Sequence, residues 1–141
     1  MARSDPKLEL LRSIPLFARA KAGELERLGQ LTDEVELPAG RVLMRQGERG
    51  AEMFILVSGA GVVERDGREI NRIGPGAWVG ELALLSEGPR TATVTLTEPS
   101  RLFVVGHREF HTLLGESEAI RQCVMDELAS RLRALEPGTV A

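Results

Sequence analysis

Short apolar runs separated by closely spaced turns fill the middle of the chain and restrict that part to a β architecture. Turn signals recur between residues 32 and 106, and the 141 residues include 15 glycines and 7 prolines. The pair Asp66-Gly67 lies between two such runs and predicts a two-residue hairpin. The spacing predicts about eight short strands, arranged as a jelly-roll barrel (a double-stranded β-helix).

Helical periodicity precedes and follows this β region, so the expected fold is mainly β with flanking helices. Asp5-Pro6 is typical of a helix start. Gly115 is expected to end a short helix, and Ser117 to cap a longer one. We therefore expect one domain, residues 1–141. It would have N-terminal helices at 1–31, the β-roll at 32–106 and two C-terminal helices at 107–136.

Charge and cysteine content exclude several classes of protein. The formal net charge is −3 and no basic run occurs, which argues against non-specific binding to nucleic acid. Cys123 is the single cysteine, so an internal disulfide is excluded. Neither a signal peptide nor an apolar run of membrane-spanning length is found. The expected location is the cytoplasm, with no membrane partner.

The segment 80–94, GELALLSEGPRTATV, carries the clearest chemistry. Gly80 lets the backbone approach a ligand closely. The residues that follow can form one helical turn, whose first amides have no internal partners and can bind an anion. Glu81 can accept hydrogen bonds from a sugar hydroxyl, and Arg90, nine positions later, offers a planar fork of donors to phosphate oxygens.

Strand parity directs Arg90 inward. Ala92, Val94 and Leu96 alternate with threonines, so the apolar set should face the core, and Arg90 falls on that same side. A cation directed inward needs an opposite charge. Two partners fit the sequence: a bound anion, or the carboxylate of Glu81.

These residues resemble the phosphate-binding cassette of cyclic-nucleotide-binding domains, found in regulatory subunits of cAMP-dependent kinase, catabolite activator proteins and cyclic-nucleotide-gated channels. The resemblance extends to SIPLF at 13–17, MFILVSG at 53–59 and GPGAWVGE at 74–81. Val79 stands where the family often has an aromatic residue.

The resemblance implies a binding module that responds to cAMP or cGMP, with no other cofactor. Glu81 would bind the ribose hydroxyl and Arg90 the cyclic phosphate. Thr91 would be a further contact, and threonine at this position is compatible with either nucleotide. The phosphate cradle would be completed by amides near Gly80, Leu82, Ala83 and Ala92.

The resemblance also implies a regulatory role for the last helix. In the family this helix swings over the base when the ligand binds, and Val124, Met125 and Leu128 are the candidate lid residues. It often pairs with a second copy, so a homodimer through this helix is expected. The chain stops at Ala141, so we expect no helix-turn-helix, no direct DNA binding, and a signal passed on through another chain.

Two other classes of function compete with this interpretation. Jelly rolls also host metal enzymes, and His107 and His111 are spaced to share a metal, but a third ligand is lacking. We therefore expect no catalytic or metal site and place both histidines on the solvated surface. The second alternative is a nucleotide-free interaction or dimerisation domain, in which Arg90 pairs with Glu81.

Overall fold

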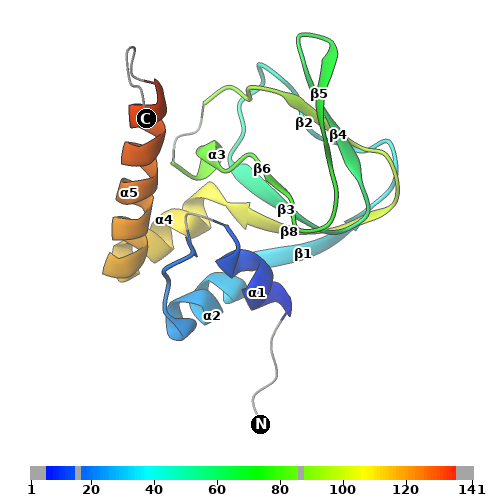
Figure 1. Cartoon of the computed structure of the whole chain (residues 1–141). Helices are drawn as coiled ribbons and strands as arrows, with labels where there is room; N and C mark the ends of the chain where they lie inside the picture. The colour runs from blue at the N-terminus through cyan, green and yellow to red at the C-terminus, as the bar shows by residue number, and fades with distance from the viewer. Residues whose placement is uncertain (1–5, 15–16, 86–87, 136–141) are drawn as a thin grey trace. The chain divides into compact units, whose positions relative to one another are not determined.

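The computed structural model describes residues 6–14, 17–85 and 88–135 (Figure 1). Its helices are α1 (Pro6–Arg12), α2 (Ala22–Gln30), α3 (Leu82–Leu85), α4 (His107–Glu116) and α5 (Glu118–Leu135). Its strands are β1 (Thr32–Leu37), β2 (Val42–Met44), β3 (Glu52–Ser58), β4 (Gly61–Arg65), β5 (Arg68–Ile73), β6 (Trp78–Val79), β7 (Thr93–Leu96) and β8 (Ser100–Gly106).

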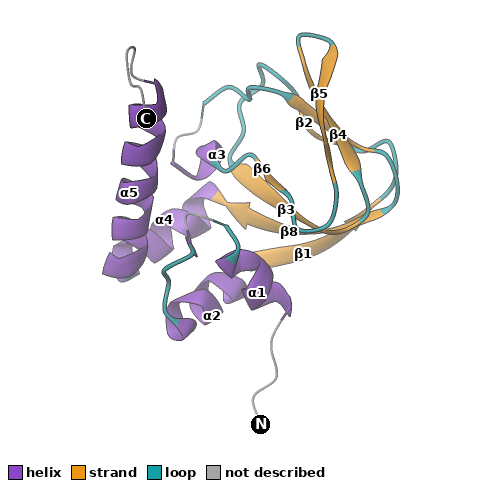
Figure 2. Cartoon of the chain, viewed as in Figure 1, coloured by secondary structure: helices purple, strands orange, loops and turns teal. Residues whose placement is uncertain are grey.

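The strands form two antiparallel sheets of four, in the orders β1-β8-β3-β6 and β2-β7-β4-β5 (Figure 2). Along the chain, successive strands alternate between the two sheets, and only the β4–β5 hairpin stays within one. This alternation is the predicted jelly-roll connectivity, and the hairpin turns at Asp66-Gly67 as expected.

The predicted jelly roll is present as two separate sheets and not as a closed barrel. In the described residues β1 and β6 are the edges of one sheet, and β2 and β5 are the edges of the other. Closure needs every strand to have two neighbours. Here β6 is only two residues long and β2 three, so these edges offer too few backbone groups to join the sheets.

A core of large apolar side chains fills the space between the two sheets. Its buried members are Met44, Phe54, Leu56, Ile73, Val94, Leu96 and Leu102. Strand β3 is buried on both faces, because Met53 and Ile55 are also fully enclosed. The run of apolar residues in β3 is therefore enclosed from both sides. Trp78, the part-buried first residue of β6, pairs with Ile55.

The chain divides into two compact units, one of residues 30–112 and the other of residues 1–29 together with 113–141. The first, the β unit, contains both sheets, α3 and the start of α4. The second, the helical unit, buries apolar side chains at near-helical spacing: Leu11, Ile14, Phe17, Leu25, Leu28, Leu113, Ile120, Cys123 and Val124.

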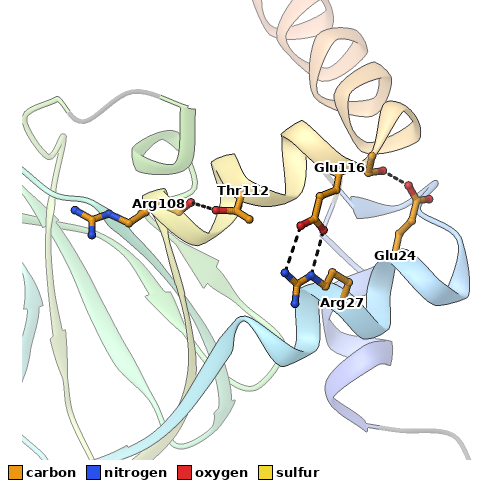
Figure 3. A network of polar contacts seen from close by, with 6 residues as sticks. Glu24, Arg27, Arg108, Thr112 and Glu116 are labelled. Carbon is orange, nitrogen blue, oxygen red and sulfur yellow. Dashed lines mark hydrogen bonds and ion pairs between the residues drawn. The ribbon is translucent and has the colours of Figure 1, made fainter.

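Polar contacts link α2 to the residues around the start of α5 (Figure 3). The guanidinium of Arg27 donates to both carboxylate oxygens of Glu116, at 3.1 and 3.3 Å. Glu24 accepts a hydrogen bond from the hydroxyl of Ser117. The same hydroxyl accepts the amide of Ile120 at 3.1 Å, which confirms Ser117 as the cap of α5.

The boundaries of the flanking helices differ from expectation at one place. Gly115 does not end the short helix, because α4 continues through it to Glu116. An interior glycine costs a helix only about 1 kcal/mol, whereas the cap at Ser117 starts a new helix in its place. The expected signal at Asp5 lies outside the described residues. None of the described helices combines the length and apolar composition needed to cross a membrane.

Candidate ligand-binding site

The first half of the site is the backbone between β6 and α3. Gly80 has a φ of +80°, a backbone conformation that residues other than glycine adopt only at an energetic cost. The amide of Ala83 donates to the carbonyl of Gly80 at 3.0 Å, and that of Leu84 to the carbonyl of Glu81 at 3.1 Å. These bonds form the single helical turn that the sequence predicted after the Gly-Glu pair.

The second half is the extended segment that carries Arg90. The amide of Arg90 donates to the carbonyl of Glu48 at 2.8 Å, and the carbonyl of Arg90 accepts the amide of Gly47, also at 2.8 Å. A further bond at 3.3 Å joins the amide of Gly50 to the carbonyl of Gly88. The loop that follows β2 therefore holds the backbone of Arg90 in place.

The guanidinium of Arg90 lies where a side chain on either of two glycines would have to go. A Cβ on Gly50 would lie 1.9 Å from Nε of Arg90, and a Cβ on Gly80 would lie 2.7 Å from its Nη1. The same Cβ on Gly80 would lie 2.9 Å from the carbonyl oxygen of Glu52 and from Cε of Met44. The arginine thus occupies a narrow space that only glycine leaves open.

The charge of Arg90 is incompletely satisfied in this position. Its Nη1 atom is buried and has no hydrogen-bond acceptor among the described residues. Burial lowers the pKa of Arg90 from its usual value, and the nearby carboxylate of Glu52 partly opposes this shift. Oε2 of Glu81 is also enclosed. The ion pairs found among the described residues do not include one between Arg90 and Glu81.

The strand parity inferred from the sequence is confirmed. Ala92, Val94 and Leu96 are buried, and Thr91 is exposed. The carbonyl of Thr91 accepts a hydrogen bond from Nε of Arg65 at 3.1 Å, so a residue of β4 approaches the end of the cassette. The side chain of Leu82 lies outside the described set.

The candidate lid residues differ in exposure within the helical unit. Val124 is buried, Leu128 is part-buried, and the side chain of Met125 is 63% exposed. Their role as a lid stays a prediction.

The expected surface position of the histidines is confirmed for His111, which is exposed, whereas His107 is part-buried, and both rings contact α3. Nδ1 of His107 lies 2.8 Å from the carbonyl oxygen of Ala83, and Nε2 of His111 lies 3.0 Å from that of Leu84. The rings are 4.2 Å apart between centroids. In the described part of the chain, no group of three residues of metal-binding type converges. The spacing of the histidines therefore serves contacts with α3.

Sequence reasoning missed Gly50, Met44 and Glu52, which surround Arg90. No motif marks them, because they come from β2, β3 and the loop between, some 40 residues before the arginine. The available signal was weak: Gly47 and Gly50 place two glycines close together in one loop.

The chain is similar in sequence and in fold to known proteins. The sequence profile of the cyclic nucleotide-binding domain matches residues 34–117. The chain is 38% identical over 116 residues to a cAMP-dependent protein kinase regulatory subunit from Mycosarcoma maydis, covering 76% of this chain and 22% of the relative. It spans 22–34% of the length of the first three curated relatives.

Two solved structures share the fold. The N-terminal domain of a transcriptional regulator from Streptomyces coelicolor A3(2) superposes with a TM-score of 0.80 at 32% identity, covering 89% of this chain and 90% of that one. The regulatory domain of Toxoplasma gondii PKA, crystallised with cAMP, gives 0.71 at 30% identity, covering 79% and 46%. Because the profile covers more than half of the sequence and includes Gly80, Glu81 and Arg90, the chain belongs to the cyclic nucleotide-binding domain family.

Proposed function

We propose that this domain binds a cyclic nucleotide at residues 80–92 and acts as a non-catalytic, ligand-responsive regulatory module. The observation that carries the proposal is the buried Nη1 of Arg90, which has no acceptor in the described residues and lies beside the glycine that opens the cassette. An enclosed guanidinium donor of this kind fits an anionic phosphate oxygen.

The roles within the site follow from charge and from the family resemblance. Arg90 would bind the cyclic phosphate, and Glu81 would accept hydrogen bonds from the ribose hydroxyl. The amides near Gly80, Leu82 and Ala92 would face the phosphate. The amide of Ala83 donates to Gly80 in this structure, so its contact with phosphate would require that hydrogen to be shared or the turn to open.

The nucleotide-free alternative predicts an internal pair between Arg90 and Glu81, and the described ion pairs lack it. A thermal-shift screen separates the two. A ligand that binds only the folded protein at 100 times its Kd adds about 2.7 kcal/mol of stability, whereas a nucleotide-free interaction domain would show no shift with either nucleotide.

We favour cAMP over cGMP as the ligand. The Mycosarcoma subunit is named for cAMP dependence, and the Toxoplasma domain was crystallised with cAMP.

Thr91 is exposed, so it is available to a ligand at the mouth of the site. A homodimer through α5, an effector on another chain and a cytoplasmic location stay predictions of the family resemblance.

Titration calorimetry with cAMP and with cGMP tests the proposal. A ligand of this size should bind with micromolar affinity or somewhat better. Arg90→Ala should weaken binding by about 2–4 kcal/mol, because a charge-assisted bidentate contact is lost. Arg41→Ala is the matched control, since Arg41 is an exposed arginine of the same unit.

Each titration has an outcome that counts against the proposal. Failure of the wild-type protein to bind either nucleotide would exclude the function. Binding unchanged in Arg90→Ala would exclude the role given to that residue. Thr91→Ala, titrated with both nucleotides, measures what its hydroxyl contributes to the choice between them.

A further inference from the structure

Two histidines of α4 reach the turn that carries the Gly-Glu pair. His107 and His111 lie one helical turn apart, and each faces the carbonyl oxygen of one residue of α3. The acceptors are consecutive: Ala83 at 2.8 Å from Nδ1 of His107, and Leu84 at 3.0 Å from Nε2 of His111. All four residues belong to the β unit.

Each contact continues into the cassette. Ala83, which accepts from His107, donates its own amide to Gly80 at 3.0 Å. Leu84, which accepts from His111, donates its amide to Glu81 at 3.1 Å. Two parallel routes of hydrogen bonds therefore lead from the imidazoles to the two residues that open the proposed site.

The contacts fix where each ring carries its hydrogen. A carbonyl oxygen only accepts, so the nitrogen that faces it must be the donor. Neutral His107 must therefore hold its hydrogen on Nδ1, and neutral His111 must hold its hydrogen on Nε2. The two rings, 4.2 Å apart between centroids, are required to be opposite tautomers.

Helix α3 depends on outside partners for its position. It has only four residues, and a helix of that length is not stable by itself. Ala83 and Leu84 are buried, so removal of the imidazoles would take away the donors that their carbonyl oxygens accept from. The position of α3 sets the positions of Gly80 and Glu81 through the turn.

We propose that His107 and His111 are positioning residues for ligand binding, which hold α3 in its binding-competent place through their donors to Ala83 and Leu84. The inference rests on the proposed function of the cassette. Neither imidazole is assigned a contact with the ligand. They act by raising the fraction of molecules whose cassette is ready, and the apparent Kd rises in proportion as that fraction falls.

The chain permits a test by matched donors. An asparagine amide reaches about as far as Nδ1 of histidine, and a glutamine amide about as far as Nε2. His107→Asn and His111→Gln therefore keep each donor in place, whereas His107→Gln and His111→Asn present it at the wrong reach. Thr112→Ala is the control on the same helix, because its hydroxyl donates to the carbonyl of Arg108 within α4 (Figure 3).

Nucleotide titration of these variants gives one set of outcomes. Each alanine variant should raise the Kd about fivefold, the change expected for one neutral hydrogen bond. The reach-matched variants should bind within about twofold of wild type, the swapped pair should resemble alanine, and Thr112→Ala should match wild type. Equal affinity of the alanine, matched and swapped variants would overturn the proposal.

A second measurement needs no ligand. Nitrogen-15 spectra of the histidine rings at a pH where both are neutral should show the Nδ1–H form for His107 and the Nε2–H form for His111. Amide exchange at Ala83 and Leu84 should accelerate in the alanine variants and not in the matched ones. If the wild type binds no nucleotide but these signatures are present, only the proposed function fails. If they are absent, the positioning role fails.

Discussion

The surroundings of Arg90 leave room for an anion, because the neighbouring residues do not satisfy its guanidinium fully. Its backbone is fixed by Glu48 and Gly47, and its guanidinium fills the space above two glycines. Nη1 is buried without an acceptor in the described residues. A binding site commonly accepts such a cost, because the ligand removes it.

Removal of this charge should stabilise the ligand-free fold. Arg90→Leu keeps an apolar stem and removes the unsatisfied donor, so the free energy of unfolding should rise by about 1 kcal/mol. Urea denaturation without nucleotide measures it, with Arg41→Leu as the exposed control. A loss of stability in Arg90→Leu larger than in the control would show that the guanidinium is well satisfied in the free protein.

Gly50 is predicted to control where the guanidinium of Arg90 lies. Gly50→Ala would place a Cβ 1.9 Å from Nε of Arg90, so the side chain must move. Nucleotide affinity should fall about tenfold, or 1.4 kcal/mol. Gly74→Ala is the control, because a Cβ there meets nothing within 4 Å and its φ is not positive. Equal affinity of the two variants would contradict this account.

Sequence reasoning at this scale succeeded where the information was local. Alternation along residues 90–96 directed Arg90 inward, and the structure has Ala92, Val94 and Leu96 buried on that side. It could not find Gly50, because that residue meets Arg90 through backbone pairing between the loop after β2 and residues 88–90, which are distant in sequence. Nor could it find acceptors for the histidines, since helical periodicity reports an apolar face and not a carbonyl on another element.

At the scale of elements, the sequence predicted the position of a turn better than the ends of the strands. The turn signal at Asp66-Gly67 predicted the β4–β5 hairpin, and the structure confirms it. Strand β2 ends at Met44, where its register against β7 shifts, and β7 begins only at Thr93. Arg90 therefore lies before β7, where its backbone bonds to Gly47 and Glu48.

The cap of α5 should contribute measurably to stability. Ser117→Ala removes a hydroxyl that accepts the amide of Ile120 and donates to the carboxylate of Glu24. The free energy of unfolding should therefore fall by about 1 kcal/mol. Ser130→Ala, at an exposed position inside the same helix, should be neutral or slightly stabilising. Thermal denaturation of both variants measures the difference. Equal midpoints would show that the cap is not needed.

At the scale of the whole molecule, the β unit contains the complete cassette and the helical unit contains α5. The predicted lid belongs to the second of these. The helical spacing of apolar residues was sufficient to predict α5, because this sequence pattern is long and regular. The sequence could not identify which of its residues meets a ligand, since an exposed apolar residue and a buried one fit the same pattern.

Met125 offers the cleanest test of the lid prediction. It is 63% exposed, so Met125→Ala should leave the stability of the protein unchanged when no nucleotide is added. If the side chain covers the base, its loss should weaken nucleotide binding by about 1 kcal/mol, from the apolar area that stays in water. Ile70→Ala, at a 49% exposed position in β5, is the control, and both are titrated with nucleotide. Equal affinities would exclude Met125 from the lid.

Trp78 gives this domain an optical reporter. It is the single tryptophan of a sequence without tyrosine, and it precedes Gly80 by two positions. Near-ultraviolet emission from the unlabelled protein therefore originates from one indole at the entrance to the cassette. Changes in its intensity or wavelength follow the surroundings of β6 alone, so rapid-mixing fluorescence can time events at this place without any attached dye.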